Sequence, residues 1–202
     1  SGIGIAKNIY SFYDQNLVFQ PNFQDGDKVK KNDVIFSISG NPKSILSTER
    51  LVLNCMQRMS GITTITRKFI DKVNDLNTII LDTRKTCPTI RFLEKYAVKL
   101  GGAENHRYGL YDMIMIKDNH IDFSGGISNA IKRCQKYYKK KIIIVEARNL
   151  KEVAEIISIG KINRILLDNF TISDTKKAVQ MINKLYQVES SGNINIKNVR
   201  NY

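Results

Sequence analysis

From residue 77 onward, short apolar runs alternate with stretches whose apolar residues recur at helical spacing. The runs are apolar on both faces, which is typical of buried parallel strands. The expected strands are 78–81, 113–116, 142–145, 164–167 and a last one that starts at 186, and the expected helices are 91–100, 126–138, 149–158 and 173–185. Strands that alternate with helices predict an α/β fold with a parallel sheet or an α/β barrel.

The first part of the chain predicts a smaller α/β region. Turn-forming residues at Asp25-Gly26-Asp27 precede a segment, 28–40, that predicts two strands around a turn. Helical spacing then predicts a helix from Ser47 to Met59, which either Ser47 or Thr48 would cap, and a second helix from Thr63 to Val73.

The length of 202 residues fits one large domain, or one domain with part of a second. The change of rhythm predicts domains over 1–76 and 77–202. No run of about 18 apolar residues occurs, so we expect no membrane span, and the N-terminus lacks the layout of a signal peptide. The cysteines have no CxxC spacing, which argues against a disulfide framework or a zinc site and favours a reducing cytoplasm; they are Cys55, Cys87 and Cys134.

The chain carries a formal net charge of +13, and part of it lies in a lysine run at Lys136 and Lys139 to Lys141. A solvated surface is the favoured interpretation. Nucleic-acid binding is less favoured, because no recognised motif and no interleaving of aromatic and basic residues accompanies the charge. Attraction of an anionic substrate is the third interpretation, since a positive field would favour it.

Polar residues stand at the carboxyl end of almost every expected strand. In α/β barrels the active site lies at that end, so these residues predict a shared pocket. They are Asp82, Arg84 and Lys85, then Lys117 and Asp118, then Glu146, then Asp168 and Asn169, and finally Glu189 and Ser191.

The cations of this set predict a ligand with two or more carboxylates or phosphates. The planar fork of an arginine such as Arg84 or Arg107 bonds both oxygens of a carboxylate. Lys85 and Lys117 supply mobile point charges. The alternative is that these cations pair with neighbouring acids, namely Asp82, Asp112 and Asp118.

The remaining polar residues divide by chemistry. Glu146 and Asp168 end neighbouring strands, and two carboxylates facing one cavity suit Mg²⁺; structural acids are the alternative, and general acid/base catalysis is less favoured. His106 beside Arg107 predicts a hydrogen bond to the ligand, whereas His120 predicts a structural role. The segment Ser190 to Asn193 predicts a backbone cradle for a phosphate.

Taken together, these segments resemble quinolinate phosphoribosyltransferase, the carboxylating nicotinate-nucleotide pyrophosphorylase. The similarity extends in order along essentially the whole chain, and its Asp-Thr-Arg-Lys-Thr and Lys-Asp-Asn-His segments are together highly specific. The matching segments are 49–54 with 60–62, 82–86 with Pro88 and Arg91, 94–98, 101–102 with 105–110, 116–121, 145–146, 167–169 and 189–194.

The resemblance implies a type II phosphoribosyltransferase fold, in which an N-terminal α/β sandwich accompanies an open α/β barrel in a homodimer or larger oligomer. It implies the transfer of phosphoribosyl from phosphoribosyl pyrophosphate to quinolinate with Mg²⁺, giving nicotinate mononucleotide, CO₂ and pyrophosphate in NAD biosynthesis. Alternatives are a transferase of the same fold for another anionic ring and a non-catalytic anion-binding scaffold.

The resemblance also implies roles for individual residues. Arg84, His106, Arg107 and Lys117 would bind the two carboxylates, Arg50 would reach a neighbouring subunit's site, and Lys85 would lie near the reacting centre. Glu146 and Asp168 would hold Mg²⁺ and the ribose–pyrophosphate, and Ser191 and Gly192 would contact the 5′-phosphate.

The chain departs from the family pattern at a few positions. Ile144 stands where a second acid is frequent, and Thr89, Ala103 and Asn193 stand where glycine is common. Family chains usually begin before the position of Ser1 and continue past that of Tyr202. The resemblance therefore implies that part of the sandwich and the last barrel segments lie outside this chain.

Overall fold

The computed structural model describes residues 1–138 and 140–202, so Lys139 of the lysine run lies outside the described residues. The chain forms two compact units, Ser1–His106 and Arg107–Tyr202, and each is described by itself. The division between compact units falls later in the chain than residue 76. Compactness does not define a domain, so the domain boundary expected between residues 76 and 77 stays a prediction.

The first unit begins with helix α1 (Ile3–Tyr13) and an antiparallel pair, β1 (Val18–Pro21) and β2 (Phe36–Ser39). Phe19 stacks on Phe36 in this pair with ring centroids 4.6 Å apart. The expectation of two strands within 28–40 is therefore wrong. Only 36–39 is a strand, and its partner lies upstream because those two segments, unlike 28–35, carry aromatic residues that pack on Tyr10 of α1.

Helix α2 runs without interruption from Pro42 to Val73, where the sequence predicted two helices. Its N-cap is Asn41, whose side chain accepts a hydrogen bond from the Lys43 N–H at 2.9 Å, and Pro42 follows at the first helical position. Thr48, one of the predicted caps, instead lies inside the helix and donates to the Ser44 carbonyl. Gly61 does not end the helix, because its flanking turns carry enough apolar contacts to hold it helical.

Helix α3 (Arg91–Leu100) forms as the sequence predicts and packs on α2 through Met59, Leu93 and Ala97. The strand predicted at 78–81 does not form; it is replaced by an isolated parallel bridge between Leu81 and Glu104. Two hydrogen bonds hold the bridge. The Asp82 N–H donates to the Glu104 carbonyl, and the Glu104 N–H donates to the Ile80 carbonyl. Ile79 is exposed in this unit, so the apolar run lacks the two-sided burial that a central strand requires.

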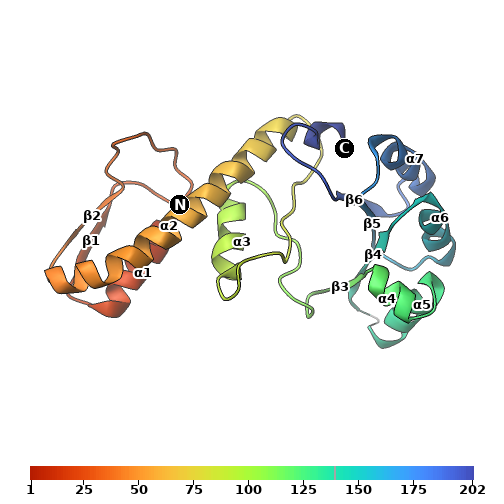
Figure 1. Ribbon diagram of the computed structural model, residues 1–202, viewed down its shortest axis with the longest axis horizontal. Coiled ribbons are helices and arrows are strands. Elements are labelled where there is room, and N and C mark those ends of the chain that lie inside the picture. Colours follow the sequence, from red (N-terminus) through yellow and green to blue (C-terminus); the bar gives the residue numbers. More distant parts are fainter. Residues whose placement is uncertain (139) are drawn as a thin grey trace. The chain divides into compact units, whose positions relative to one another are not determined.

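The second unit contains a four-stranded sheet in the order β3-β4-β5-β6, and its strands are parallel, as the sequence predicts (Figure 1). Its strands are β3 (Met113–Ile116), β4 (Ile142–Ala147), β5 (Arg164–Asp168) and β6 (Gln187–Ser191). Its helices are α4 (Asp118–Phe123), α5 (Ile127–Tyr137), α6 (Leu150–Ile159), α7 (Ile172–Ile182) and a final 3-10 turn, Val199–Asn201.

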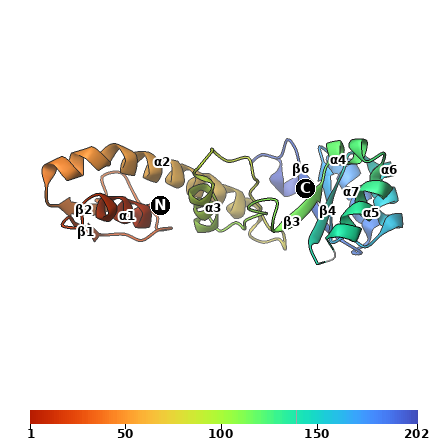
Figure 2. The same cartoon turned by 90° about the horizontal axis from the view of Figure 1, so that it is seen from below.

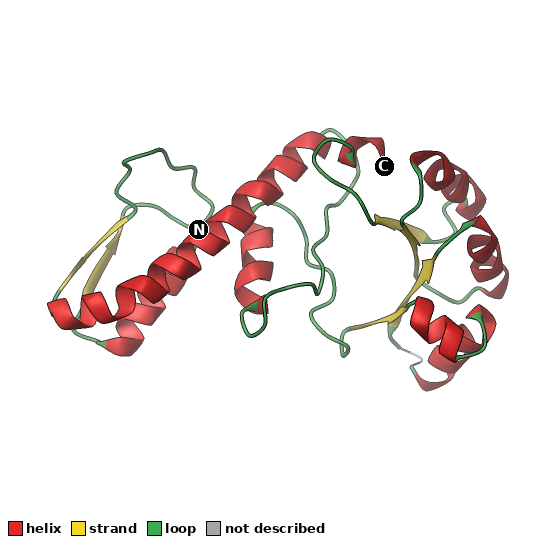
Figure 3. Cartoon of the chain, in the orientation of Figure 1, coloured by secondary structure: helices red, strands yellow, loops and turns green. Residues whose placement is uncertain are grey.

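The four α-helices of this unit gather on one face of the sheet (Figures 2 and 3). The core under them contains every second strand residue, among them Ile116, Val145, Ile165 and Leu167. The alternate residues therefore lie on the opposite face. That face carries the polar side chains predicted to form the site, together with the buried Ile144 and Leu166.

Local sequence explains the ends of these helices. The side chains of Asn149 and Thr171 accept hydrogen bonds from the N–H groups of Glu152 and Asp174, which starts α6 and α7. Helix α7 ends at Ile182 rather than at the predicted residue 185, because Asn183 and the residue after it adopt left-handed backbone angles. The short helix α4 was not predicted.

Two further expectations are met in the part of the chain that the structure covers. All three cysteines are free. Within residues 1–138 and 140–202, no helix combines the length and the hydropathy that crossing a membrane requires.

Two glycines give a stability test with opposite signs. A Cβ at Gly101 would lie 2.5 Å from the Thr66 Cβ on α2, whereas a Cβ at Gly61 has no atom within 4 Å. We expect Gly101→Ala to lower the free energy of unfolding by about 1–3 kcal/mol through overpacking. Gly61→Ala should raise it by roughly 0.5–1 kcal/mol, because alanine loses less backbone entropy in a helix. Urea unfolding followed by circular dichroism measures both; equal effects would contradict the close α2–α3 contact.

Candidate active site

The segment that carries Arg84 and Lys85 is anchored at its start by Asp82. The Asp82 Oδ1 lies 2.5 Å from the Lys95 Nζ on α3 and accepts the His106 N–H at 2.8 Å. The same Lys95 donates to the His106 carbonyl at 3.0 Å. Two of the predicted site segments, 82–86 and 105–106, are thus joined within the first unit. Asp82, proposed from sequence as a possible partner for the site cations, pairs with Lys95.

Two other side chains on the same face of α3 hold the rest of this loop. Arg91 donates from Nε to the Thr86 hydroxyl at 3.0 Å and from Nη2 to the Arg84 carbonyl at 3.4 Å. Glu94 accepts the Cys87 N–H at 3.2 Å and forms an ion pair with Arg58 of α2. Residues 91, 94 and 95 lie on one side of a helix by their spacing, so a single helix face fixes the loop from Asp82 to Cys87.

Arg84 presents a buried donor that the protein leaves open. Its Nε is buried and has no hydrogen-bond partner among the described residues. A buried N–H of a guanidinium without an acceptor is costly, so the site suits an oxygen-bearing anion. Lys85, the next residue, is exposed, and its own N–H is fixed by the Thr83 hydroxyl.

Arg50 lies on the exposed side of α2. Across residues 1–138 and 140–202, no hydrogen bond or ion pair engages its side chain. It therefore stands apart from the Asp82–His106 group in the contacts that the first unit makes.

In the second unit, Asp112 shapes the loop that follows Arg107. Its carboxylate accepts the N–H groups of Tyr108 at 2.6 Å, Gly109 at 3.3 Å and Met113 at 3.2 Å. Burial raises the pKa of this carboxyl, but the backbone N–H groups together outweigh burial and hold the pKa below its usual value. The Arg107 Nη1 donates to the Met113 carbonyl at 3.4 Å. Asp112 thus accepts hydrogen bonds from the backbone here, rather than forming the ion pair that was the alternative interpretation.

Lys117 follows β3 directly. It forms an ion pair with Glu146 of the neighbouring strand β4, with 3.6 Å between Nζ and Oε2. Its N–H donates to the Nδ1 of His120 at 2.9 Å, which closes the first turn of α4. His120 therefore has the structural role that the sequence predicts. Asp118 accepts the Asn119 N–H at 2.7 Å.

Glu146 is buried, and its pKa is raised from the usual value of 4.5. Burial is the largest cause, the Lys117 ammonium opposes it, and the nearby Asp168 and Asp118 carboxylates add to it. Glu146 and Asp168 point from the same face of the sheet, because Glu146 pairs in register with Leu166, two residues before Asp168. The structure thus brings the two predicted acids together with Lys117.

Asp168 belongs to a hydrogen-bond network at the ends of β5 and β6. Its Oδ1 accepts the Ser191 hydroxyl at 2.7 Å and its Oδ2 accepts the Asn169 side-chain N–H at 2.9 Å. A Cβ at Gly192 would lie 2.1 Å from the Asn169 Oδ1, and Gly192 has a φ of 86°, so only glycine fits there. The predicted phosphate-cradle residues and Asp168 are therefore neighbours.

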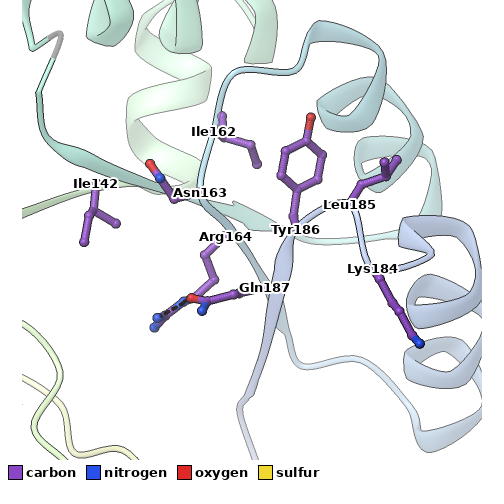
Figure 4. A pocket seen from close by; sticks show the side chains of 8 residues that line it. All are labelled: Ile142, Ile162, Asn163, Arg164, Lys184, Leu185, Tyr186 and Gln187. Atoms are coloured by element: carbon purple, nitrogen blue, oxygen red, sulfur yellow. Dashed lines mark hydrogen bonds between the residues drawn. The ribbon is translucent and has the colours of Figure 1, made fainter.

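Glu189 is the third acid on this face, and a neighbouring arginine balances its charge. Arg164 forms an ion pair with Glu189 and donates to the Gln187 Oε1 at 2.7 Å and 3.1 Å. Arg164 and Gln187 also line a cavity of about 720 Å³ at the amino ends of β4 to β6 (Figure 4). This cavity lies at the other end of the strands from Glu146 and Asp168. Because ligands of such sheets bind at the carboxyl ends, we do not place the site there.

Sequence reasoning missed four residues of this arrangement. Arg91, Glu94 and Lys95 lie in segments that the resemblance matched, but no role was assigned to them, and Asn169 was noted only as a strand-end residue. A charged residue on the core-facing side of a helix was the available signal for Lys95, since a buried ammonium requires a fixed partner.

Comparison with known proteins identifies the family of the chain. The family described as quinolinate phosphoribosyl transferase, C-terminal domain, matches residues 62–202, and the corresponding N-terminal domain family matches residues 1–60. The chain belongs to the quinolinate phosphoribosyltransferase family.

Relatives named as nicotinate-nucleotide pyrophosphorylase [carboxylating] cover nearly the whole chain. The chloroplastic protein of Arabidopsis thaliana is 40% identical over 98% of this chain and 62% of its own length. A probable member from Synechocystis is 38% identical over 98% of this chain and 68% of its own length. The crystal structure of the Ehrlichia chaffeensis protein is 40% identical, with a TM-score of 0.94, covering 100% of this chain and 73% of that one. The chain thus spans 62% of the length of the Arabidopsis relative.

The fold is that of a type II phosphoribosyltransferase, as the sequence predicts. The structure also shows the surroundings of the residues that depart from the family pattern. Asn193 has a φ of 55°, which asparagine tolerates, and its side chain donates to the Asn169 Oδ1 at 3.1 Å. Ala103 is buried without a positive φ. Thr89 has a φ of 68°, a strained angle for a β-branched residue. Ile144 is fully buried two residues before Glu146.

The raised pKa of the buried Glu146 predicts a pH-dependent stability, which its ion pair with Lys117 moderates. Because the folded pKa of Glu146 is raised, the folded protein holds this proton longer than the unfolded chain. The free energy of unfolding therefore falls as pH rises from 4.5 toward the folded pKa. Removing the cation in Lys117→Met should raise this pKa further and extend the fall to higher pH, by about 1.4 kcal/mol per unit of added shift. Urea unfolding across this pH range measures the slope. The exposed Lys151→Met is the control, and an unchanged slope in Lys117→Met would contradict the pairing.

Proposed function

We propose that this chain transfers the phosphoribosyl group of phosphoribosyl pyrophosphate to quinolinate with loss of CO₂. The products are nicotinate mononucleotide, CO₂ and pyrophosphate, in the biosynthesis of NAD. The names of the relatives support the proposal, since the Arabidopsis protein is named nicotinate-nucleotide pyrophosphorylase [carboxylating] and the Synechocystis protein is named as a probable one.

The observation that carries the proposal is the open donor of Arg84. Its Nε is buried without a hydrogen-bond partner in the described part of the chain, in a loop that α3 holds at both ends. An arginine fork bonds both oxygens of one carboxylate. A planar dicarboxylate such as quinolinate supplies that acceptor and a second one for further cations.

The substrate residues divide into two sets in this proposal. Arg84, His106, Arg107 and Lys117 bind the carboxylates of quinolinate, and Lys85 lies near the reacting centre. Arg50, exposed on α2, reaches the site of a second copy in a homodimer or larger oligomer. Glu146, Asp168, Ser191 and Gly192 form the phosphoribosyl pyrophosphate side.

The donor set on the phosphoribosyl side fits Mg²⁺ as a substrate-bound ion. Among the described residues no group of three or more His, Cys, Asp and Glu side chains is placed to hold a metal. Mg²⁺ is commonly held by one or two carboxylates together with substrate phosphates and water, and Glu146 and Asp168 supply these two. When bound, the ion would neutralise charge on the departing pyrophosphate. The Ser191 hydroxyl and the Asn169 amide hold the Asp168 carboxylate in its orientation.

The chain's own charges suit both chemical stages. Departure of pyrophosphate leaves positive charge on the ribose ring, which the Glu146 and Asp168 carboxylates stabilise. The ring nitrogen of quinolinate forms the new bond to the ribose carbon. Loss of CO₂ then leaves an electron pair on the adjacent ring carbon, next to a cationic nitrogen, and that carbon takes up a proton. Fixed cations such as Arg84 in a site that excludes water assist this stage.

The compartment stays a prediction from the sequence, which favours the cytoplasm. Some relatives carry other locations in their names, chloroplastic in Arabidopsis thaliana and mitochondrial in Nicotiana tabacum.

Quinolinate should raise the melting temperature of the protein, and Arg84→Ala should abolish the shift, because the buried donor for the carboxylate is lost. Differential scanning calorimetry with and without quinolinate measures the shift, and the exposed Arg133→Ala on α5 serves as a control for charge. Release of labelled CO₂ from quinolinate in the presence of phosphoribosyl pyrophosphate then separates an enzyme from a non-catalytic scaffold. No quinolinate-dependent shift in the wild type would refute the substrate assignment.

Mg²⁺-dependent binding of phosphoribosyl pyrophosphate should weaken as pH falls through the raised pKa of Glu146. Protonation removes one of two carboxylate ligands, so the affinity should drop by up to about tenfold per pH unit below that pKa. In Glu146→Gln the affinity should already be low and nearly independent of pH. Isothermal titration calorimetry measures the constants, with the exposed Glu155→Gln as control. A wild-type pH profile that Glu146→Gln reproduces would exclude Glu146 as the metal ligand.

A further inference from the structure

Lys95 has a contact pattern that the proposed chemistry does not use. Its side chain is fully buried, with 0% exposed. Its ammonium bonds the Asp82 carboxylate at 2.5 Å and the His106 carbonyl at 3.0 Å, and the same Asp82 oxygen accepts the His106 N–H at 2.8 Å. One buried cation thus joins α3 to the two segments that carry Arg84, Lys85 and His106.

We propose that Lys95 is a positioning residue for quinolinate recognition, which sets the orientation of His106 relative to the Arg84 loop by clamping Asp82 and the His106 carbonyl. This inference rests on the function proposed above. Lys95 does not contact the substrate in this proposal, because its ammonium is directed at the protein's own oxygens.

The physical reason lies in the cost of a buried charge. An ammonium removed from water requires acceptors in good geometry, and leaving it without them is strongly unfavourable. The Asp82 carboxylate and the His106 carbonyl, which both accept from Lys95, lie outside α3. A rotation of either segment would break a hydrogen bond to the buried charge, so these bonds restrict the relative orientation of the two segments.

The other contacts of α3 show why this restriction affects the residues proposed to bind the ligand. Arg91 holds the Arg84 carbonyl and the Thr86 hydroxyl, while Glu94 holds the Cys87 N–H. These contacts fix the distal part of the loop but not His106. Lys95 also bonds His106, so it relates the position of His106 to that of the Arg84 loop.

Three variants test the inference by calorimetric titration with quinolinate and, separately, with phosphoribosyl pyrophosphate and Mg²⁺. Lys95→Met leaves Asp82 buried without its cation and is the variant at risk of unfolding. The double variant Lys95→Met with Asp82→Asn removes both charges and keeps an oxygen for the His106 N–H, so it should fold. Lys99→Met, exposed one turn along the same helix, is the matched control.

We expect the double variant to be folded by circular dichroism and to bind quinolinate on the order of tenfold to a hundredfold more weakly than the control, as misplaced binding groups do. Its affinity for phosphoribosyl pyrophosphate should stay within about twofold. Equal losses for both ligands would indicate a general structural role and overturn the inference, as would quinolinate affinity equal to that of Lys99→Met. A wild-type protein that binds no quinolinate would overturn the proposed function, and with it this inference.

Discussion

The parallel register of β3 to β6 is the constraint on which the second unit depends. Because paired residues of parallel strands point to the same face, the register sends Val145 and Ile165 under the helices, and Glu146 and Asp168 to the opposite face. The same register places Ser191 beside Asp168. A shift of one residue would exchange these faces and bury the acids in the apolar core. The site therefore follows from the packing of the helices on the sheet.

In the first unit the site segments are loops rather than strand ends, so a sheet does not hold them in place. Loops hold functional side chains in place only when other elements fix them. Helix α3 does this with the three charged residues Arg91, Glu94 and Lys95, which bond the loop from Asp82 to Cys87. These contacts fix the loop. The Arg84 Nε, which the loop carries, is buried and has no acceptor among the described residues. That open donor connects the fold to the proposed dicarboxylate substrate.

The sequence predicted the elements of the second unit well and those of the first unit poorly. Apolar runs such as 142–145 and 164–167 have enough length and two-sided burial to define a strand by themselves. The run 78–81 has similar composition but forms a single bridge, because it lacks a strand partner on each side. The continuous α2 and the pairing of β1 with β2 likewise depend on contacts between distant segments, which periodicity along the chain does not reveal.

By itself the sequence determined the family, the parallel sheet and the identity of the polar residues at the strand ends, because these depend on local patterns and on specific motifs. Only the tertiary structure decided which of those residues meet. It paired Lys117 with Glu146, joined Asp168 to Ser191 and Asn169, and assigned Asp82 to the buried Lys95. The physical reason is that a charge or hydrogen bond acquires its partner from the packing of segments far apart in the chain, and burial then sets its strength.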